Sequence, residues 1–453
     1  MDKEKIIDDI LRDKIMEEEI EVPEEIKAII KDTIDNLPKK SNKKKIIKRS
    51  IVSAATVVIG LSIFSAKFPA IAKNIPIVNS VFSFLIDKAT LHSSYYGYSD
   101  ELKLSEANNG VVVNIDSVVY DSIEIAIGYT VKSNKKIEGP NYFSGTFKIN
   151  GEEIGFGGSN TGKFLDDYTY VGVKKIGISK DYFPESIRNS ILGGSIKIPD
   201  KFDMDINLKE IFKGMEGEWN FNFNVSNEKV KDKVKSMPLN IDLSNIEKNN
   251  KVNGLLITPL NTAIRTSMDN RENNYHRIKY MIIDDRGRYL RTKGSSGAGD
   301  MENFYLEDRF TPVYDDTKTL TFIPYIEKEI KEGEVKYEYE NLNLKDKTYI
   351  SLGKSGNVII DSIEFLDDST IIKYRLEGLM EVKDRRNITL VNDNGEEYDI
   401  NFENSSRDEK SGEIIGKLPK LNKNHSYRIK FINPEGKLEI KLMEDSLFTV
   451  DLK

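Results

Sequence analysis

The chain has 453 residues, a formal net charge of −7 and 31% charged residues, and its length suits about three domains of ordinary size. It contains no cysteine, so disulfides, zinc–thiolate sites and cysteine nucleophiles are excluded. The basic residues are not gathered in one folded stretch and the three histidines lie far apart, so the composition predicts neither nucleic-acid binding nor a histidine-based metal site.

Residues 1–45 are predicted to form a short helical segment. Its clearest pattern is an apolar stripe with the period of an α-helix, made of Ile26, Ile29, Ile30, Ile34 and Leu37. Pro23 suits the first turn of this helix, and Pro38 ends it. So short a helix needs a surface that covers its apolar face. Two interpretations follow: a helical hairpin beneath the membrane, or a helix that docks on a cytoplasmic partner.

Residues 46–66 are predicted to form one transmembrane helix. Residues 50–66 contain no charge, and Ile46 and Ile47 extend the apolar stretch because the long side chains beside them reach the lipid headgroups. The residues that flank the start of this helix are basic: Lys43, Lys44, Lys45, Lys48 and Arg49. Positive residues stay in the cytoplasm and contact anionic lipid, so the N-terminus is predicted to be cytoplasmic and the rest extracytoplasmic.

A cleaved signal peptide is the alternative for the same stretch. Ala70-Ile71-Ala72 has the small-x-small form of a cleavage site. The charged region in front of the apolar stretch is far longer than that of a signal peptide, which favours a retained anchor. Residues 67–94 are then a juxtamembrane linker, in which residues 78–86 are predicted to form a short amphipathic helix that rests on the first β domain or on the bilayer.

From about residue 105 the apolar period changes to two, which indicates strands with one buried face. An internal repeat is visible: residues 110–131 resemble residues 356–376, and residues 252–268 occupy the same place more loosely. Each opening is followed by a hairpin signal, at Asn150-Gly151, at 285–287 and at Asn394-Gly395. Each copy then closes with an aromatic alternating strand: WNFNFNVS, TLTFIPYI and SYRIKFIN.

The predicted fold is therefore mainly β, with tandem immunoglobulin-like β-sandwich domains at 95–238, 239–348 and 349–453 after the helical segment and the transmembrane helix. A sandwich is favoured over a barrel because short strands and turns recur at this spacing.

No catalytic, cofactor-binding or metal-binding residue is predicted, and the chain is expected not to be an enzyme. Four adjacent aspartate pairs are explained by turn chemistry, with calcium between domains as the alternative: Asp166-Asp167, Asp284-Asp285, Asp315-Asp316 and Asp367-Asp368. The stretch IGFGGSN lacks the lysine of a phosphate loop, so its glycines are predicted to stand in a loop or bulge.

The layout resembles a family of Gram-positive single-span membrane proteins, and the most specific segments are residues 70–85 and 217–226. Members carry an extracytoplasmic domain of unknown function, often followed by an immunoglobulin-like domain, and they are described as anti-sigma factors. The resemblance implies a sensor of an envelope ligand that holds a cytoplasmic sigma factor at the membrane. The zinc-binding type of anti-sigma domain has a CxxC motif, which this chain lacks. The alternative is a cell-surface binding or structural module without cytoplasmic signalling.

Overall fold

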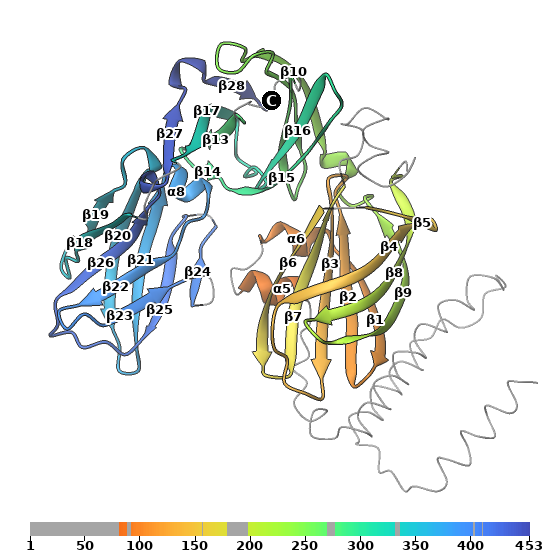
Figure 1. Cartoon of the computed structure of the whole chain (residues 1–453), viewed down its shortest axis with the longest axis horizontal. Helices are drawn as coiled ribbons and strands as arrows, with labels where there is room; N and C mark the ends of the chain where they lie inside the picture. Colours follow the sequence, from red (N-terminus) through yellow and green to blue (C-terminus); the bar gives the residue numbers. More distant parts are fainter. Residues whose placement is uncertain are drawn as a thin grey trace, which may run out of the picture. The chain divides into compact units, whose positions relative to one another are not determined.

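The computed structural model describes residues 81–87, 92–155, 157–178, 198–269, 277–330, 336–401, 404–409 and 411–453. The predicted cytoplasmic segment, the transmembrane helix at 46–66 and much of the linker lie outside these residues. Within the described ranges, no helix combines the length and the apolar content that a bilayer crossing requires. This part of the chain is mainly β and is arranged in six sheets (Figure 1).

Two sheets enclose the first hydrophobic core, and we call them the first sheet pair. Their strand orders are β1-β2-β3-β7-β6 and β5-β4-β8-β9. The strands are β1 (Asp100–Asn108), β2 (Val111–Tyr120), β3 (Glu124–Ser133), β4 (Asn141–Ile149), β5 (Glu152–Glu153), β6 (Gly157–Asp166), β7 (Thr169–Gly177), β8 (Lys201–Phe212) and β9 (Glu216–Ser226). In β9, Trp219, Phe221 and Phe223 are buried while the residues between them are exposed, as the period of two predicts.

The second sheet pair has strand orders β10-β11-β12-β16-β15 and β14-β13-β17-β27, with β28 also pairing with β17. Its strands are β10 (Lys235–Asp242), β11 (Lys251–Ile257), β12 (Thr262–Asp269), β13 (Lys279–Asp284), β14 (Tyr289–Leu290), β15 (Thr292–Gly299), β16 (Asn303–Phe310), β17 (Thr319–Glu329), β27 (Leu438–Leu442) and β28 (Phe448–Asp451). Ile264, Tyr280 and Phe322 pack in the core between its two sheets.

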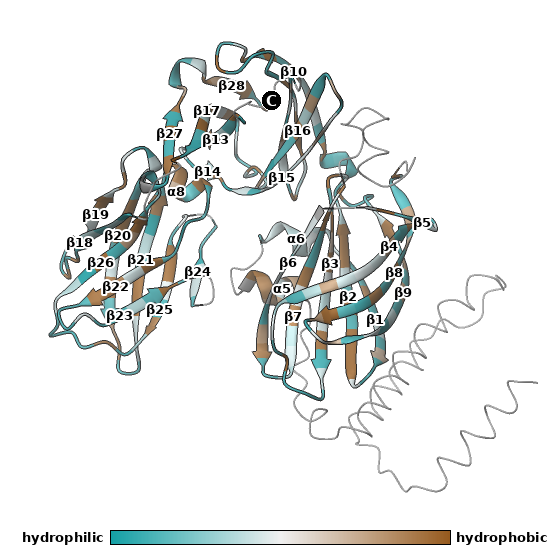
Figure 2. Cartoon of the chain, viewed as in Figure 1, coloured by the Kyte–Doolittle hydropathy of each residue, from teal (hydrophilic) through white to brown (hydrophobic). Residues whose placement is uncertain are grey.

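The third sheet pair has strand orders β19-β20-β21-β25-β24 and β18-β26-β22-β23. Its strands are β18 (Lys336–Asn341), β19 (Thr348–Ser351), β20 (Asn357–Phe365), β21 (Ser369–Glu377), β22 (Ile388–Asn392), β23 (Glu397–Ile400), β24 (Ser405–Arg407), β25 (Ile414–Pro419) and β26 (Tyr427–Asn433). Figure 2 shows hydrophobic and hydrophilic residues alternating along many strands, as expected for sheets with one buried face.

Three of the five-stranded sheets share one topology, which confirms the predicted repeat. In each, a hairpin (β2-β3, β11-β12 or β20-β21) pairs through its second strand with a later strand (β7, β16 or β25), and that strand pairs with the one before it. Each hairpin also contains one register shift in its first strand. Similar sequence at 110–131, 252–268 and 356–376 therefore encodes the same local structure three times.

The second and third sheet pairs both contain strands from each side of the domain boundary predicted between residues 348 and 349. Strands β27 and β28 lie beyond the third sheet pair in sequence, yet both pair with β17 of the second. Strands β18 and β19 begin before residue 349 and belong to the third pair. In sequence, the third pair is thus inserted between β17 and β27. Strand β17 takes β27 and β28, at the end of the chain, as its hydrogen-bonding partners on one side.

The three closing strands do not occupy the same place in their sheets: the strand of the first copy differs from the other two. TLTFIPYI and SYRIKFIN lie in β17 and β26, each of which pairs with the first strand of the Asn-Gly-type hairpin. In the first pair that place is taken by β8, and WNFNFNVS forms the edge strand β9. A half-buried edge strand has the same alternation as a strand one place inward, so the pattern could not distinguish them.

All three predicted hairpin turns are confirmed, joining β4 to β5, β13 to β14 and β22 to β23. At the first turn both Asn150 and Gly151 have positive φ, at 51° and 85°. At the other two only the glycine does, with Gly287 at 79° and Gly395 at 82°. The four aspartate pairs stand at strand ends, turns and bends, as predicted.

Short helices complete the described structure: α5 (Val81–Asp87), α6 (Ser94–Tyr98), α8 (Leu379–Val382) and the 3₁₀ turns Lys231–Lys233, Gly353–Ser355, Pro434–Gly436 and Glu444–Ser446. Helix α5 rests on the first sheet pair, where Val81, Phe82 and Leu85 are fully buried with Val171 and Val173 of β7. Of the two surfaces predicted for this helix, the β domain is therefore the one it covers.

Candidate functional site

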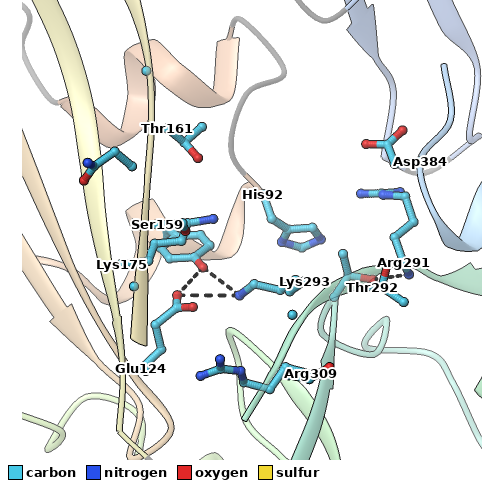
Figure 3. Close-up of a pocket in the computed structure, with 18 of the residues that line it drawn as sticks. His92, Glu124, Ser159, Thr161, Lys175, Arg291, Thr292, Lys293, Arg309 and Asp384 are labelled. Atoms are coloured by element: carbon cyan, nitrogen blue, oxygen red, sulfur yellow. Dashed lines mark hydrogen bonds and ion pairs between the residues drawn. The ribbon is translucent and has the colours of Figure 1, made fainter. Parts of the chain in front are cut away.

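A cavity of about 750 Å³ with many charged residues in its lining lies within the described residues. All three sheet pairs line it: β3, β6 and β7 of the first, β15 and β16 of the second, and residues 384, 386 and 409 of the third, together with His92 and Tyr95 (Figure 3). A cavity of this size is in the range of small-molecule sites.

The lining of the cavity is rich in positive charge. Six basic side chains face three carboxylates, with the basic set being Lys163, Lys175, Arg291, Lys293, Arg309 and Arg386 and the acidic set Glu124, Asp384 and Glu409. His92 adds no charge at neutral pH, because burial lowers its pKa to about 4. The net excess of positive charge predicts attraction of anions into the cavity.

Lys293 of β15 reaches across to the first sheet pair. Its Nζ donates to Tyr95 Oη (2.7 Å), Asn261 Oδ1 (2.5 Å) and the Leu260 carbonyl (3.1 Å), and it lies 3.6 Å from Glu124 Oε1. Tyr95 in turn donates to Glu124 Oε1 at 2.5 Å. Burial lowers the pKa of Lys293 to about 8, although Glu124 opposes this shift.

Glu124 is the carboxylate that lies beside Lys293 in the cavity. Burial alone would raise its pKa, but the charges of Lys293 and Lys175 and the bond from Tyr95 outweigh burial and hold the pKa below its usual value. Arg309 lowers it further. Glu124 is therefore an ionised group shared among three cations.

A buried polar junction beside the cavity joins the first and second sheet pairs. Asp121, which is fully buried, accepts from the backbone N–H groups of Ile123 (3.0 Å) and Glu124 (2.8 Å). It also accepts from Thr258 Oγ1 (2.5 Å) and Asn261 Nδ2 (2.7 Å), which precede β12. Because Asn261 also binds Lys293, this junction fixes the position of Lys293 in the cavity.

Thr258→Val is expected to lower the stability of this junction by about 1–3 kcal/mol, because the fully buried Asp121 loses a hydroxyl donor. Hydrogen exchange measured by mass spectrometry should show faster exchange in peptides that cover residues 117–126 and 255–264. Thr389→Val is the matched control, since Thr389 makes an exposed bond to Asp399. Equal exchange in wild type and Thr258→Val would contradict the assignment.

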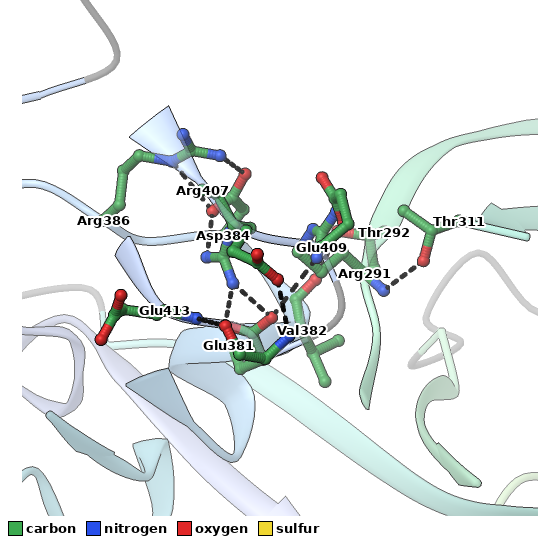
Figure 4. Close-up of polar contacts among 12 residues, drawn as sticks. Arg291, Thr292, Thr311, Glu381, Val382, Asp384, Arg386, Arg407, Glu409 and Glu413 are labelled. Carbon is green, nitrogen blue, oxygen red and sulfur yellow. Dashed lines mark hydrogen bonds and ion pairs between the residues drawn. The ribbon is translucent and has the colours of Figure 1, made fainter. Parts of the chain in front are cut away.

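The opposite wall of the cavity is tied to the third sheet pair by an ion network (Figure 4). Arg291 binds Glu409 (2.5 Å) and lies 3.6 Å from Glu381. Arg407 donates to both oxygens of Glu381 at 2.6 Å and to Asp384 at 2.7 Å. Asp384 also binds Arg386 at 2.5 Å. These charges largely neutralise one another.

The predicted site residues lie elsewhere in the chain. The apolar stripe (Ile26, Ile29, Ile30, Ile34 and Leu37) and the membrane-flanking basic residues (Lys43, Lys44, Lys45, Lys48 and Arg49) all fall outside the described residues. The cavity residues were not predicted, because they come from segments up to hundreds of positions apart and no local motif marks them. One signal was misinterpreted: Gly157 and Gly158 stand in the edge strand β6, and Gly158 lines the cavity.

The described residues contain no group of three or more metal-ligating side chains. Carboxylates in the cavity are instead bound by arginine, lysine and tyrosine. The cavity therefore presents charged and hydrogen-bonding groups on its surface.

Two family models match parts of the chain. Residues 41–133 match a domain of unknown function (DUF4179), and residues 232–354 match a family of unknown function (DUF5643). The first match includes β1, β2 and β3, and the second runs from the turn before β10 to just past β19. The chain thus carries two domains of unknown function, in agreement with the coarser part of the resemblance.

No curated protein matches the sequence. Among solved structures, the chain is similar to one described as the crystal structure of the conserved domain protein from Bacillus anthracis, with 19% identity and a TM-score of 0.43. That match covers 60% of this chain and 91% of the other. A likeness at this level assigns no ligand and no activity.

Proposed function

We propose that the chain is a membrane-anchored extracytoplasmic sensor and regulator of the anti-sigma type, which binds a cell-envelope ligand in the cavity. The observation that carries the proposal is that the cavity takes side chains from all three sheet pairs, among them Glu124, Lys293 and Asp384. A ligand that contacts all three sheet pairs stabilises one relative arrangement of these pairs over others. A switch driven by binding requires such a difference in affinity between arrangements.

The proposed location is the cell membrane, crossed once by residues 46–66, with residues 1–45 in the cytoplasm and the sheet pairs outside. Sequence supports it through the uncharged stretch and its basic flank. The absence of cysteine permits a test without background. A membrane-impermeant maleimide added to intact cells should label Lys423→Cys, which is exposed in the turn before β26, and should leave Ser41→Cys unlabelled until the cells are opened. The reverse pattern would overturn the orientation.

The proposed cytoplasmic partner is a sigma factor, held by the apolar stripe of residues 26–37. Affinity purification of the full chain from membranes should recover the sigma factor, and the variant Ile30→Asp/Ile34→Asp should lose it. Ala28→Asp/Lys31→Gln is the matched control, because it lowers the net charge by the same amount on the face of the helix opposite the stripe. Equal recovery by the stripe variant, or a normal response after residues 1–38 are replaced by an unrelated sequence, would leave a cell-surface binding module as the function.

The proposed role is binding and not catalysis, and the sheet pairs are proposed to be immunoglobulin-like. Support for the fold comes from two sheets that enclose each core and from the strand order repeated three times. Support for binding comes from the cavity carboxylates, each of which is held by a basic partner.

A further inference from the structure

Three cations converge on one carboxylate in the cavity. Lys175 projects from β7, Lys293 from β15 and Arg309 from β16, and all three act electrostatically on Glu124. The structure brings them together from two sheet pairs, and Figure 3 shows them with Glu124. Glu124 neutralises one of the three positive charges, and the buried Asp121 beside the cavity acts on Lys293 as well, so one to two positive charges remain uncompensated in a partly enclosed site.

Two of these cations have unused binding capacity within the described residues. Arg309 makes one long bond, from Nη2 to Ser296 Oγ at 3.3 Å, and its buried Nη1 has no acceptor. Lys175 lies over the ring of Tyr95, 5.2 Å from its centroid, and its Nζ forms no ion pair with a carboxylate of the described residues. Buried donors are normally satisfied, so a group left without an acceptor points to a missing partner.

The neutral part of the lining consists mainly of groups that bind hydroxyls. It includes the side chains of Ser159, Asn160, Thr161, Thr292, Ser295 and Ser296. Each of these groups can both donate and accept hydrogen bonds. They suit a ligand with several hydroxyls and are poor partners for an apolar one.

We propose that the cavity binds a phosphorylated sugar or polyol, with the phosphate held by hydrogen bonds from Lys175 and Arg309 and by the charge of Lys293, and the hydroxyls held by the Ser, Thr and Asn side chains. A phosphate monoester carries about −1.5 to −2 charges at pH 7, which matches the uncompensated charge better than a single carboxylate does. Arginine and lysine together are typical phosphate ligands. The inference rests on the proposed function only in treating the cavity as the ligand site.

Calorimetry on the full chain in detergent tests the inference with glucose 6-phosphate, glucose and inorganic phosphate. Glucose 6-phosphate should bind at least about tenfold more tightly than either of the others, since each part alone uses half of the site. Equal binding of inorganic phosphate would overturn the role of the hydroxyl groups. Equal binding of glucose, or no binding of any of the three, would overturn the proposal.

Two variants locate the binding without disturbing the junction at Asp121. Lys175→Met and Arg309→Met should each weaken binding of glucose 6-phosphate about tenfold or more, because each removes a charge-assisted bond. Lys135→Met removes the same charge from an exposed position outside the cavity and should bind as wild type does. Unchanged affinity in both cavity variants would overturn the proposed site.

The affinity should also depend on pH through Lys293, whose pKa is about 8. Lys293 is charged at pH 7 and neutral at pH 9, and the phosphate stays dianionic over this range, so the affinity should fall about tenfold as the pH rises. The groups that act on Lys293 are Glu124, Lys175, Asp121 and Arg309, with Tyr95 bonded to its Nζ. Constant affinity from pH 7 to 9 would contradict the role of Lys293.

These binding measurements do not depend on membrane orientation or on a cytoplasmic partner. If the cysteine labelling contradicts the orientation but calorimetry detects binding, the proposed sensor is rejected and the cavity remains a site for a phosphorylated sugar. If calorimetry detects no binding but the labelling and the sigma-factor recovery give the expected results, this ligand is rejected and the proposed regulator remains.

Discussion

Arg407→Ala is expected to destabilise the third sheet pair by about 3–5 kcal/mol, because it leaves the buried carboxylate of Glu381 without its main partner and removes one of the two arginines bound to Asp384. The side chain of Arg407 is fully buried, and that of Glu381 is 8% exposed. Arg291 lies 3.6 Å from Glu381, too far to replace the two lost hydrogen bonds. The effect should extend to the contact between the third pair and the cavity wall.

Hydrogen exchange of the full chain is the suitable measurement, since a chain with several sheet pairs need not unfold in one step. Peptides from α8 and β24 should exchange faster in Arg407→Ala, while those from β2 and β3 should not change. The double variant Arg407→Met/Glu381→Met should recover much of the loss, because it removes both charges together. Equal loss in the single and the double variant would show that packing and not charge pairing explains the effect.

Trp219→Ala is expected to destabilise the first sheet pair by about 3–5 kcal/mol, the cost of a large cavity in a core. Trp219 is fully buried, and its indole N–H donates to the Val111 carbonyl at 3.1 Å, which links β9 to β2. Faster hydrogen exchange and earlier proteolysis within residues 100–226 would show the loss.

Trp219→Phe keeps most of the packing and loses the hydrogen bond, so a smaller loss of about 1–2 kcal/mol is expected. Because Trp219 is the single tryptophan of the chain, its fluorescence in the wild-type protein reports unfolding of the first pair alone. If Trp219→Ala left exchange in this pair unchanged, the assignment of Trp219 to its core would be wrong.

The strands, the hairpins and the repeat could be predicted because they depend on neighbouring residues. Alternation in β9 follows directly from Trp219, Phe221 and Phe223, and the turn at Asn150-Gly151 follows from the positive φ that these residues tolerate. The pairing of β17 with β27 and β28 could not be predicted in this way, because nothing local in residues 438–451 specifies a partner more than a hundred positions earlier.

The cavity could not be predicted for a related reason. Lys293 and Arg309 stand in ordinary strands and Glu124 opens another, so none of them is marked by its local sequence. Their significance depends on their shared position beside one another, which arises from the packing of separate sheets. Charge clusters that form across sheets leave no spacing in the sequence.

The insertion of the third sheet pair between β17 and β27 sets the order in which the chain can mature. As residues emerge from a ribosome or an export channel, the third pair has all its strands once residue 433 has appeared, whereas the second still lacks those that cover the outer edge of β17. That edge stays open to other chains until residues 438–451 arrive. A nick or truncation that removes those residues would therefore reopen the middle of the protein and leave the unit nearest the cut intact.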